Sequence, residues 1–183
     1  VGVLSLLNVN AQGISVSTFE ELQSAVSGDY DTIILSADIP ITETLEIDDE
    51  KIVTTGGSYS LVRGSGFASN LISVSQSGNL TLQSQGTLTI DGGSEACQGS
   101  LINNKGSLHI KSGVELINNN SSLSGSAVNN SGSFTLDGGA IYNNSQTAES
   151  GRYGVIYSND NSSLTIKSGE IHDNTTTTSG TIF

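Results

Sequence analysis

The chain has 183 residues and a formal net charge of −12, from six Lys and Arg against eighteen Asp and Glu. This length suffices for one domain with a sizeable core, and the few, scattered basic residues argue against nucleic-acid binding and against an anionic membrane surface as a partner. Only 34% of the residues are hydrophobic, but they recur at regular intervals, which indicates a folded repeat protein rather than a disordered chain.

The first residues predict a processing signal. Residues 1–7 are almost entirely apolar, and Val9 and Ala11 occupy the small-residue positions before a plausible cleavage point. We interpret residues 1–11 as the remnant of a signal peptide, which predicts a secreted or cell-surface protein; a short apolar first strand is the alternative. No run of about 18 apolar residues is present, so no membrane span is expected.

A short helix is predicted over residues 18–27. Ser17 and Glu20 have the spacing of a capping box, and Gly28 is a suitable residue to end the helix. The apolar residues of one helical face are Phe19, Leu22, Ala25 and Val26. We expect this helix to cover one end of a repeat array, because such an end exposes core residues and unpaired strand edges.

Residues 12–70 are assigned to this cap and to two irregular early coils. Their strand signals lie at Ile33–Leu35, Leu45–Ile47, Ile52–Val53 and Ser60–Val62. Residues 71–183 form a regular repeat, in which an apolar pair follows a small residue. These pairs begin at Leu71, Leu101, Ala127, Val155 and Thr181, at spacings of 30, 26, 28 and 26 residues. The last five residues restart the pattern, so further coils or an anchoring domain are expected beyond Phe183.

Each repeat contains three short strand signals separated by turns rich in Gly, Asn and Ser. The middle signal alternates, so one set of side chains is expected inside and the other outside. The expected inward residues are Leu108, Ile110, Phe134, Leu136, Leu164 and Ile166, and the outward ones include His109, Thr135 and Thr165. Because three short strands cannot bury their apolar faces alone, the coils should stack into three parallel sheets. The predicted fold is therefore an all-β, single-stranded parallel β-helix with three short strands per coil and an N-terminal capping helix.

Two sets of polar residues recur at equivalent places in successive repeats. Asn104 and Asn130 end the first strand, whereas Asn119, Asn144 and Asn174 end the third. Stacked side-chain amides should form hydrogen-bonded ladders along the axis. Lys111, Asp137 and Lys167 follow the middle strand, and we expect these three charges to alternate in one column on the surface.

The helix, the strand at Thr32–Leu35 and the later Leu-Thr-Leu and Leu-Thr-Ile segments resemble the pectin lyase-like superfamily of right-handed parallel β-helices. The C-terminal repeats are most similar to bacterial surface proteins of the polymorphic outer-membrane protein type of adhesin. Gly138-Gly139-Ala140-Ile141 matches the Gly-Gly-Ala-Ile half of the motif of those proteins. The resemblance covers residues 14–183 and implies a right-handed coil. It does not decide activity, because the superfamily contains both enzymes and inert stalks.

No catalytic, cofactor or metal-binding residue is predicted. Glycoside hydrolases need close carboxylates, and the acidic run Asp48-Asp49-Glu50 is interpreted as a solvated turn without a basic residue beside it. His109 and His172 fall on different coils, which argues against a shared metal site. Cys97 is alone and is expected to be a small buried residue. The run of threonines at 175–178 is not repeated in neighbouring coils, which argues against an ice-binding face.

Two functions therefore remain open at this stage. The first is a non-catalytic module for adhesion, for binding environmental or host glycans or surface proteins, or for spacing. The second is a polysaccharide lyase or hydrolase whose site lies outside this chain or is incomplete in it.

Overall fold

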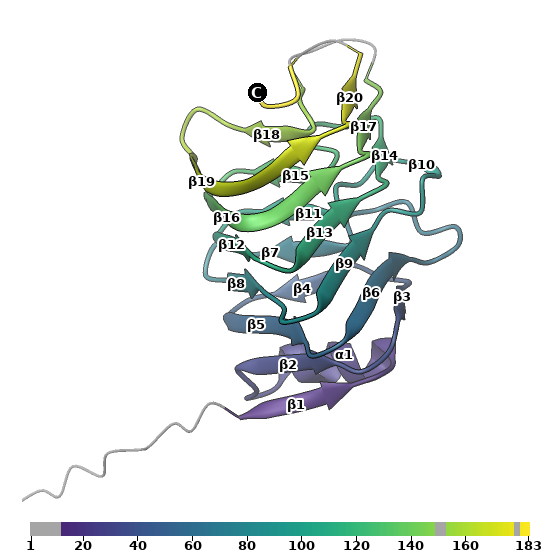
Figure 1. Cartoon of the computed structure of the whole chain (residues 1–183), viewed down its shortest axis with the longest axis vertical. Coiled ribbons are helices and arrows are strands. Elements are labelled where there is room, and N and C mark those ends of the chain that lie inside the picture. Colours follow the sequence, from purple (N-terminus) through teal and green to yellow (C-terminus); the bar gives the residue numbers. More distant parts are fainter. Residues whose placement is uncertain (1–11, 149–152, 178–179) are drawn as a thin grey trace, which may run out of the picture.

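The computed structural model describes residues 12–148, 153–177 and 180–183 (Figure 1). The proposed signal-peptide remnant at residues 1–11 lies outside the described residues. The described chain winds into a parallel β-helix in which neighbouring coils pair through parallel strands. Its only helix is α1 (Phe19–Ser27), at one end of the stack (Figure 1).

The strands form three sheets that run along the axis of the β-helix. The eleven strands of the large sheet are β1 (Gly13–Val16), β2 (Thr32–Leu35), β3 (Ile39–Ile41), β5 (Glu50–Thr55), β6 (Ser58–Arg63), β8 (Asn79–Leu82), β9 (Thr87–Asp91), β12 (Ser107–Lys111), β13 (Val114–Ile117), β16 (Ser133–Tyr142) and β19 (Ser163–His172). The five-stranded sheet contains β4 (Leu45–Ile47), β7 (Ile72–Val74), β11 (Ile102–Asn104), β15 (Val128–Asn130) and β18 (Ile156–Ser158). The four-stranded sheet contains β10 (Ala96–Cys97), β14 (Asn120–Ser121), β17 (Ser145–Gln146) and β20 (Thr175–Thr176).

Three parallel sheets were predicted, but their membership differs from the prediction. The middle and third strands of each repeat belong to the same large sheet, and they become one continuous ten-residue strand in β16 and again in β19. We call β2, β5, β8, β12 and the first half of β16 the first wing of this sheet. The second wing contains β3, β6, β9, β13 and the second half of β16. The third sheet is built from two-residue strands, which are too short to produce a periodic signal in the sequence.

The repeat alignment made from the sequence is confirmed. Ile102 pairs with Ile72 on one side and with Val128 on the other, and Val128 pairs with Ile156. An isolated parallel bridge then joins Ile156 to Ile182. These pairs reproduce the predicted spacings of 30, 26, 28 and 26 residues. The early strands join the same ladders, since β4 pairs with β7, β5 with β8 and β6 with β9.

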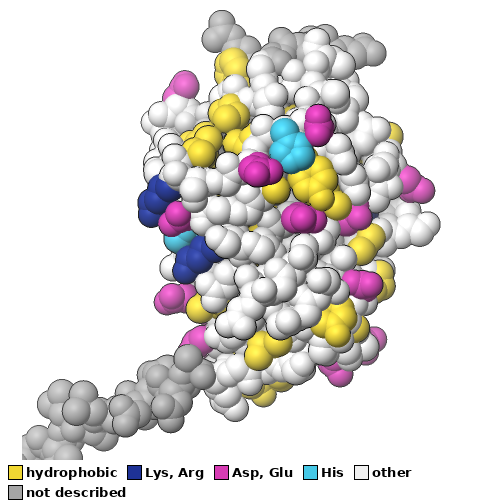
Figure 2. All heavy atoms as spheres, in the orientation of Figure 1, with side chains coloured by type: hydrophobic (Ala, Val, Ile, Leu, Met, Phe, Trp, Pro, Cys, Tyr) yellow, Lys and Arg dark blue, Asp and Glu magenta, His cyan; other side chains and the backbone are white. Residues whose placement is uncertain are grey.

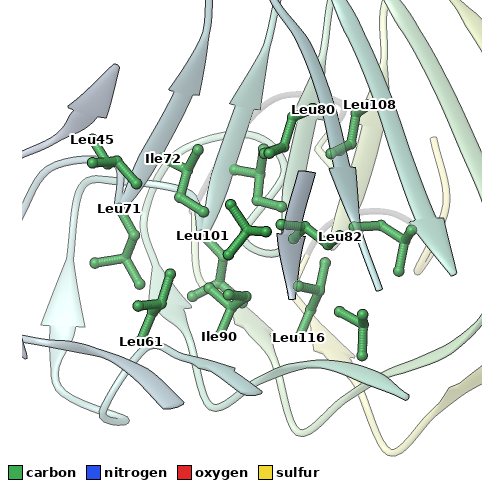
Figure 3. Packing of buried hydrophobic residues seen from close by; sticks show 14 of the residues in the cluster. Leu45, Leu61, Leu71, Ile72, Leu80, Leu82, Ile90, Leu101, Leu108 and Leu116 are labelled. Atoms are coloured by element: carbon green, nitrogen blue, oxygen red, sulfur yellow. The ribbon is translucent and has the colours of Figure 1, made fainter. Parts of the chain in front are cut away.

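The interior is a continuous apolar core. Leu108, Ile110, Phe134 and Leu136 are buried as predicted and stack in register from β12 to β16. Figure 3 shows this packing, with Leu80 of β8 beside Leu108 of the next coil. The alternation places His109, Thr135 and Thr165 on the outer face.

The prediction that Leu164 and Ile166 are buried is wrong. They are in register with Phe134 and Leu136, but Leu164 is only partly buried and Ile166 is 45% exposed. The reason is their position in the stack, because β19 is the last strand of the large sheet in the described chain and no described strand pairs with its far edge. Inward orientation therefore buries a side chain only where another coil covers it.

The N-cap of α1 lies one residue later than predicted. Thr18, rather than Ser17, is the N-cap, and Glu21, rather than Glu20, completes the capping box. Ser17 still contributes, because its backbone N–H donates to Glu21 Oε2 at 2.7 Å. Leu22, Ala25 and Val26 are buried, and α1 contacts β1, β2, β3 and β4. The helix thus covers the end of the core, as expected.

The two asparagine ladders are confirmed. Asn104 Nδ2 donates to Asn130 Oδ1 at 2.7 Å. In the second ladder, the backbone N–H of Asn119 donates to Asn144 Oδ1 at 3.0 Å, and that of Asn144 donates to Asn174 Oδ1 at 3.0 Å. All except Asn174 are buried, so these amides satisfy backbone groups that would otherwise be buried without partners.

Candidate ligand-binding groove

A column of glycines marks the corner where the two wings of the large sheet meet. A Cβ on Gly113 would lie 2.5 Å from the carbonyl oxygen of Ser84, and one on Gly139 would lie 2.7 Å from that of Val114. Gly86 packs in the same way against the backbone of Gly57. Gly139 also has a φ of +74°, a conformation that L-residues rarely adopt. Backbone therefore packs directly on backbone at this corner.

A groove with a volume of about 710 Å³ lies beside this corner, and Gly56 of the corner contributes to its lining. The groove runs along the axis across five successive strands of the first wing. Its lining residues are Ile34, Thr54, Thr55, Gly56, Gln83, Ser84, Gln85, Lys111, Ser112 and Asp137. The turns rich in Gly, Asn and Ser are visible in the sequence, but the groove beside them was not predicted.

Charged residues cluster at one end of the groove, and their pairing differs partly from the predicted charge column. Lys111 lies opposite Asp137 in the backbone register, but Lys111 Nζ donates to Gln83 Oε1 at 3.4 Å. Asp137 pairs instead with Lys167 Nζ at 3.4 Å and with His109 Nε2 at 3.6 Å. Figure 2 shows basic, acidic and His side chains close together along this edge of the molecule.

These contacts set the ionisation of Asp137. Desolvation of the carboxyl raises its pKa, but the hydrogen bond and charge of Lys167, the Ser168 hydroxyl and the charge of His109 together hold the pKa below its usual value. Asp137 is therefore suited to accept hydrogen bonds as a carboxylate rather than to donate a proton near neutral pH.

The acidic run at Asp48-Asp49-Glu50 does have a basic partner, so that part of the prediction is wrong. Lys51 Nζ lies 2.9 Å from Asp49 Oδ1 and donates to the carbonyl oxygen of Gly28 at 3.0 Å. Lys51 occupies an inward position of β5, opposite Leu80, and its side chain is only 2% exposed. The sequence signal was present, because Lys51 lies two residues before Val53 and so points to the same, inward side of the strand.

A second buried cation, Arg63, lies at the end of β6. Its Nε donates to the carbonyl oxygen of Gly92 at 3.2 Å, and its Nη2 donates to Asn119 Oδ1 at 2.9 Å. Burial lowers the pKa of the Arg63 guanidinium. Cys97 is buried as expected, and its thiol donates to the carbonyl oxygen of Gly99 at 3.3 Å. This cluster ties three coils together and lies away from the groove.

The two histidines lie apart, since His109 is in the first wing and His172 of β19 is opposite Tyr142 of the second wing. His172 stacks on Tyr142, with ring centroids 5.0 Å apart, and its Nδ1 lies 2.8 Å from Asp173 Oδ2. The Tyr142 hydroxyl donates to Glu115 Oε2 at 3.0 Å, and burial together with this carboxylate raises the pKa of Tyr142. Within the described residues, no group of three or more His, Cys, Asp or Glu side chains is arranged to hold a metal ion.

The threonine run at 175–178 lies partly in β20. Thr175 and Thr176 pair with Ser145 and Gln146 of the preceding coil, whereas Thr178 lies outside the described residues. The neighbouring positions in the four-stranded sheet are therefore not threonines.

Comparison with known proteins adds no identification. No protein-family model matches the chain, and no curated protein or solved structure shows significant similarity to it. Within the described chain, no helix has both the length and the apolar character needed to cross a membrane.

Proposed function

We propose that the chain is a non-catalytic binding module that holds an extended, polar ligand in the axial groove. The observation that carries this proposal is the groove itself, which follows the corner across five coils and is lined mainly by hydroxyl and amide side chains. Such groups form many individually weak hydrogen bonds, which suits adhesion to glycans or to surface proteins.

The proposed biological setting is a secreted or cell-surface protein. The parallel β-helix supports a relation to the pectin lyase-like superfamily, and Gly138-Gly139-Ala140-Ile141 supports a relation to surface adhesins of the polymorphic outer-membrane protein type. In this chain, the two glycines of that segment form part of the groove corner. The apolar segment at residues 1–7 supports secretion.

The alternative function is that of a polysaccharide lyase or hydrolase. The groove contains Asp137, whose lowered pKa disfavours a role as general acid. The described lining of the groove contains no second carboxylate, and Lys111 donates a hydrogen bond to Gln83. These contacts favour binding over bond cleavage.

A glycan-array experiment with matched variants tests the proposal. Gln85 is exposed and lines the groove, so Gln85→Trp should block it and reduce binding at least about tenfold. Ser131 is exposed at a different turn, between β15 and β16, so Ser131→Trp should bind like the unmodified chain. Equal binding by the two variants would place the ligand elsewhere, and release of shortened glycan would favour the enzyme.

A further inference from the structure

We infer that the groove is built for a neutral, linear glycan that lies parallel to the axis, with about four sugar units in contact. This inference rests on the proposed binding function and specifies the ligand of the same groove.

The first argument is the spacing of the lining residues. Ile34 pairs with Thr54, and Lys111 pairs with Asp137. Continuing the neighbouring ladders by one residue places Gln83 between Thr54 and Lys111. The five side chains therefore form one outward column with a step of about 4.8 Å and a length of about 19 Å. This step is close to the length of one pyranose unit, so each coil can place one side chain against each successive sugar.

The second argument is the chemistry of the wall. The side chains of Thr54, Gln85 and Ser112 line the groove and form no hydrogen bond with another described side chain or backbone group. Hydroxyl and amide groups can both donate and accept, as sugar hydroxyls do. Ile34, which is 37% exposed, adds an apolar surface at the other end of the column from Asp137, where a sugar ring can place its C–H face.

The third argument is charge. Lys111 and Asp137 are the only charged residues of the lining, and both lie at the same end of the groove. Asp137 already has Lys167 and His109 as partners, so this end carries charges of both signs. A polyanion would be repelled by the net charge of −12 on the chain. A polycation would be repelled by Lys111 and Lys167 at this end of the groove. A ligand without charge meets neither penalty.

The direct test is a calorimetric titration with linear oligosaccharides, from disaccharide to hexasaccharide, in neutral and uronic-acid series. We expect affinity for the neutral series to rise up to the tetrasaccharide and then level off. It should change little between low salt and about 1 M salt, where the screening length is about 3 Å. Uronic-acid oligomers should bind at least about tenfold more weakly. Tighter binding of the uronic-acid series, or a strong salt dependence, would overturn the inference while leaving a glycan-binding groove in place.

A matched pair of variants tests the contact itself. Thr54→Val removes a hydroxyl from the groove at nearly constant volume and should weaken tetrasaccharide binding by about threefold to tenfold. Thr135→Val makes the same change one column away and should leave affinity unchanged. If Thr54→Val binds normally while Gln85→Trp abolishes binding, the ligand occupies the groove but does not contact this column, and the inference is wrong. If no oligosaccharide of either series binds and the side-chain amide resonances of Gln83 and Gln85 do not shift, the proposed glycan-binding function fails as well.

Discussion

The two ends of the described stack differ in how the apolar core is covered. At one end, α1 lies over the core and buries Leu22, Ala25 and Val26, while Lys51 bonds the carbonyl oxygen of Gly28 at the end of the helix. At the other end, β19 presents an inner face that is not covered by a further described strand, and Ile166 is 45% exposed. The same inward register thus gives a buried side chain at one end and an exposed one at the other.

This difference shows that burial in a coil is a property of two neighbours rather than of one coil. Alternation in the sequence decides which way a side chain points, but the adjacent coil or cap decides whether water is excluded. The same kind of substitution should therefore change the free energy of unfolding by different amounts at the covered end and at the β19 end, even when the two side chains are chemically similar.

The largest expected difference is between two aliphatic truncations. Leu22→Ala removes a fully buried side chain on the inner face of α1 and should lower the free energy of unfolding by about 2–5 kcal/mol. Ile166→Ala removes an inward but exposed side chain and should cost less than about 1 kcal/mol. Urea denaturation followed by circular dichroism measures both. Equal costs would mean that the inner face of β19 is covered in solution.

The next difference concerns the asparagine ladder. Asn144 is buried, its Nδ2 donates to the carbonyl oxygen of Leu116 at 2.9 Å, and its Oδ1 accepts from the backbone N–H of Asn119. Asn144→Leu leaves these backbone groups without partners and should cost about 2–3 kcal/mol. Asn161→Leu, at an exposed turn, should change stability by less than about 0.5 kcal/mol. Identical melting temperatures would rule out a stabilising ladder.

A smaller effect is expected for two lysines. Lys51→Met keeps most of the volume of a buried side chain but loses its bonds to Gly28 and Asp49. Because burying the ammonium is itself costly, the net loss should be only about 1–2 kcal/mol. Lys167→Met removes an exposed partner of Asp137 and should fall within about 0.5 kcal/mol of the unmodified chain. A stabilised Lys51→Met variant would show that desolvation outweighs the bonds at the helix end.

The smallest expected effect on stability comes from the ionisation of two carboxyls, Glu21 and Asp137, whose pKa values are lowered for different reasons. Backbone and side-chain hydrogen bonds from Ser17 lower the pKa of Glu21 at the start of α1. At Asp137, desolvation raises the pKa, but the hydrogen bond and charge of Lys167, the hydrogen bond of Ser168 and the charge of His109 together lower it. Each contributes stability at pH above its unfolded pKa, and that stability is lost as the pH falls through its lowered, folded pKa.

Salt should distinguish the two groups. Screening by about 1 M salt should move the pKa of Asp137 towards its usual value and leave that of Glu21 nearly unchanged. Titration followed by ¹³C NMR of the side-chain carboxyls measures both values in one sample. A shift of equal size for both carboxyls would mean that the charges of Lys167 and His109 contribute no more at Asp137 than neutral hydrogen bonds do at Glu21.

The regular coils could be predicted from the sequence because each carries its own signals. The alternation at Leu108 and Ile110 and the asparagines at strand ends recur with the repeat, so residue spacing alone set the correct register. The two-residue strands, such as Asn120–Ser121, could not be predicted, since two residues have no periodicity. The exposure of Ile166 also escaped prediction, because it depends on what lies next to the coil.

The groove escaped prediction for a different reason. Its lining residues come from five coils, and most of them resemble ordinary surface threonines, serines and glutamines when each is considered alone. The glycines at the corner were visible, but their effect depends on stacking. Gly113 and Gly139 pack against the backbone of the preceding coil, so the lining residues of successive coils lie one strand spacing apart. The inward lysine at position 51 was missed because the acidic run before it was interpreted as a solvated turn without a basic residue beside it.

The glycine column also determines how such a binding surface could change in size. Three successive coils contribute a corner with the same close packing, at Gly86, Gly113 and Gly139, and the strands that precede these corners stay in register although the repeats differ in length. Duplication or deletion of a whole coil would therefore lengthen or shorten the groove by one rung of about 4.8 Å while its cross-section stays constant. In evolutionary terms, recombination between repeats would add or remove whole coils. The length of ligand that the groove holds would then change in steps of one coil, without redesign of any single contact.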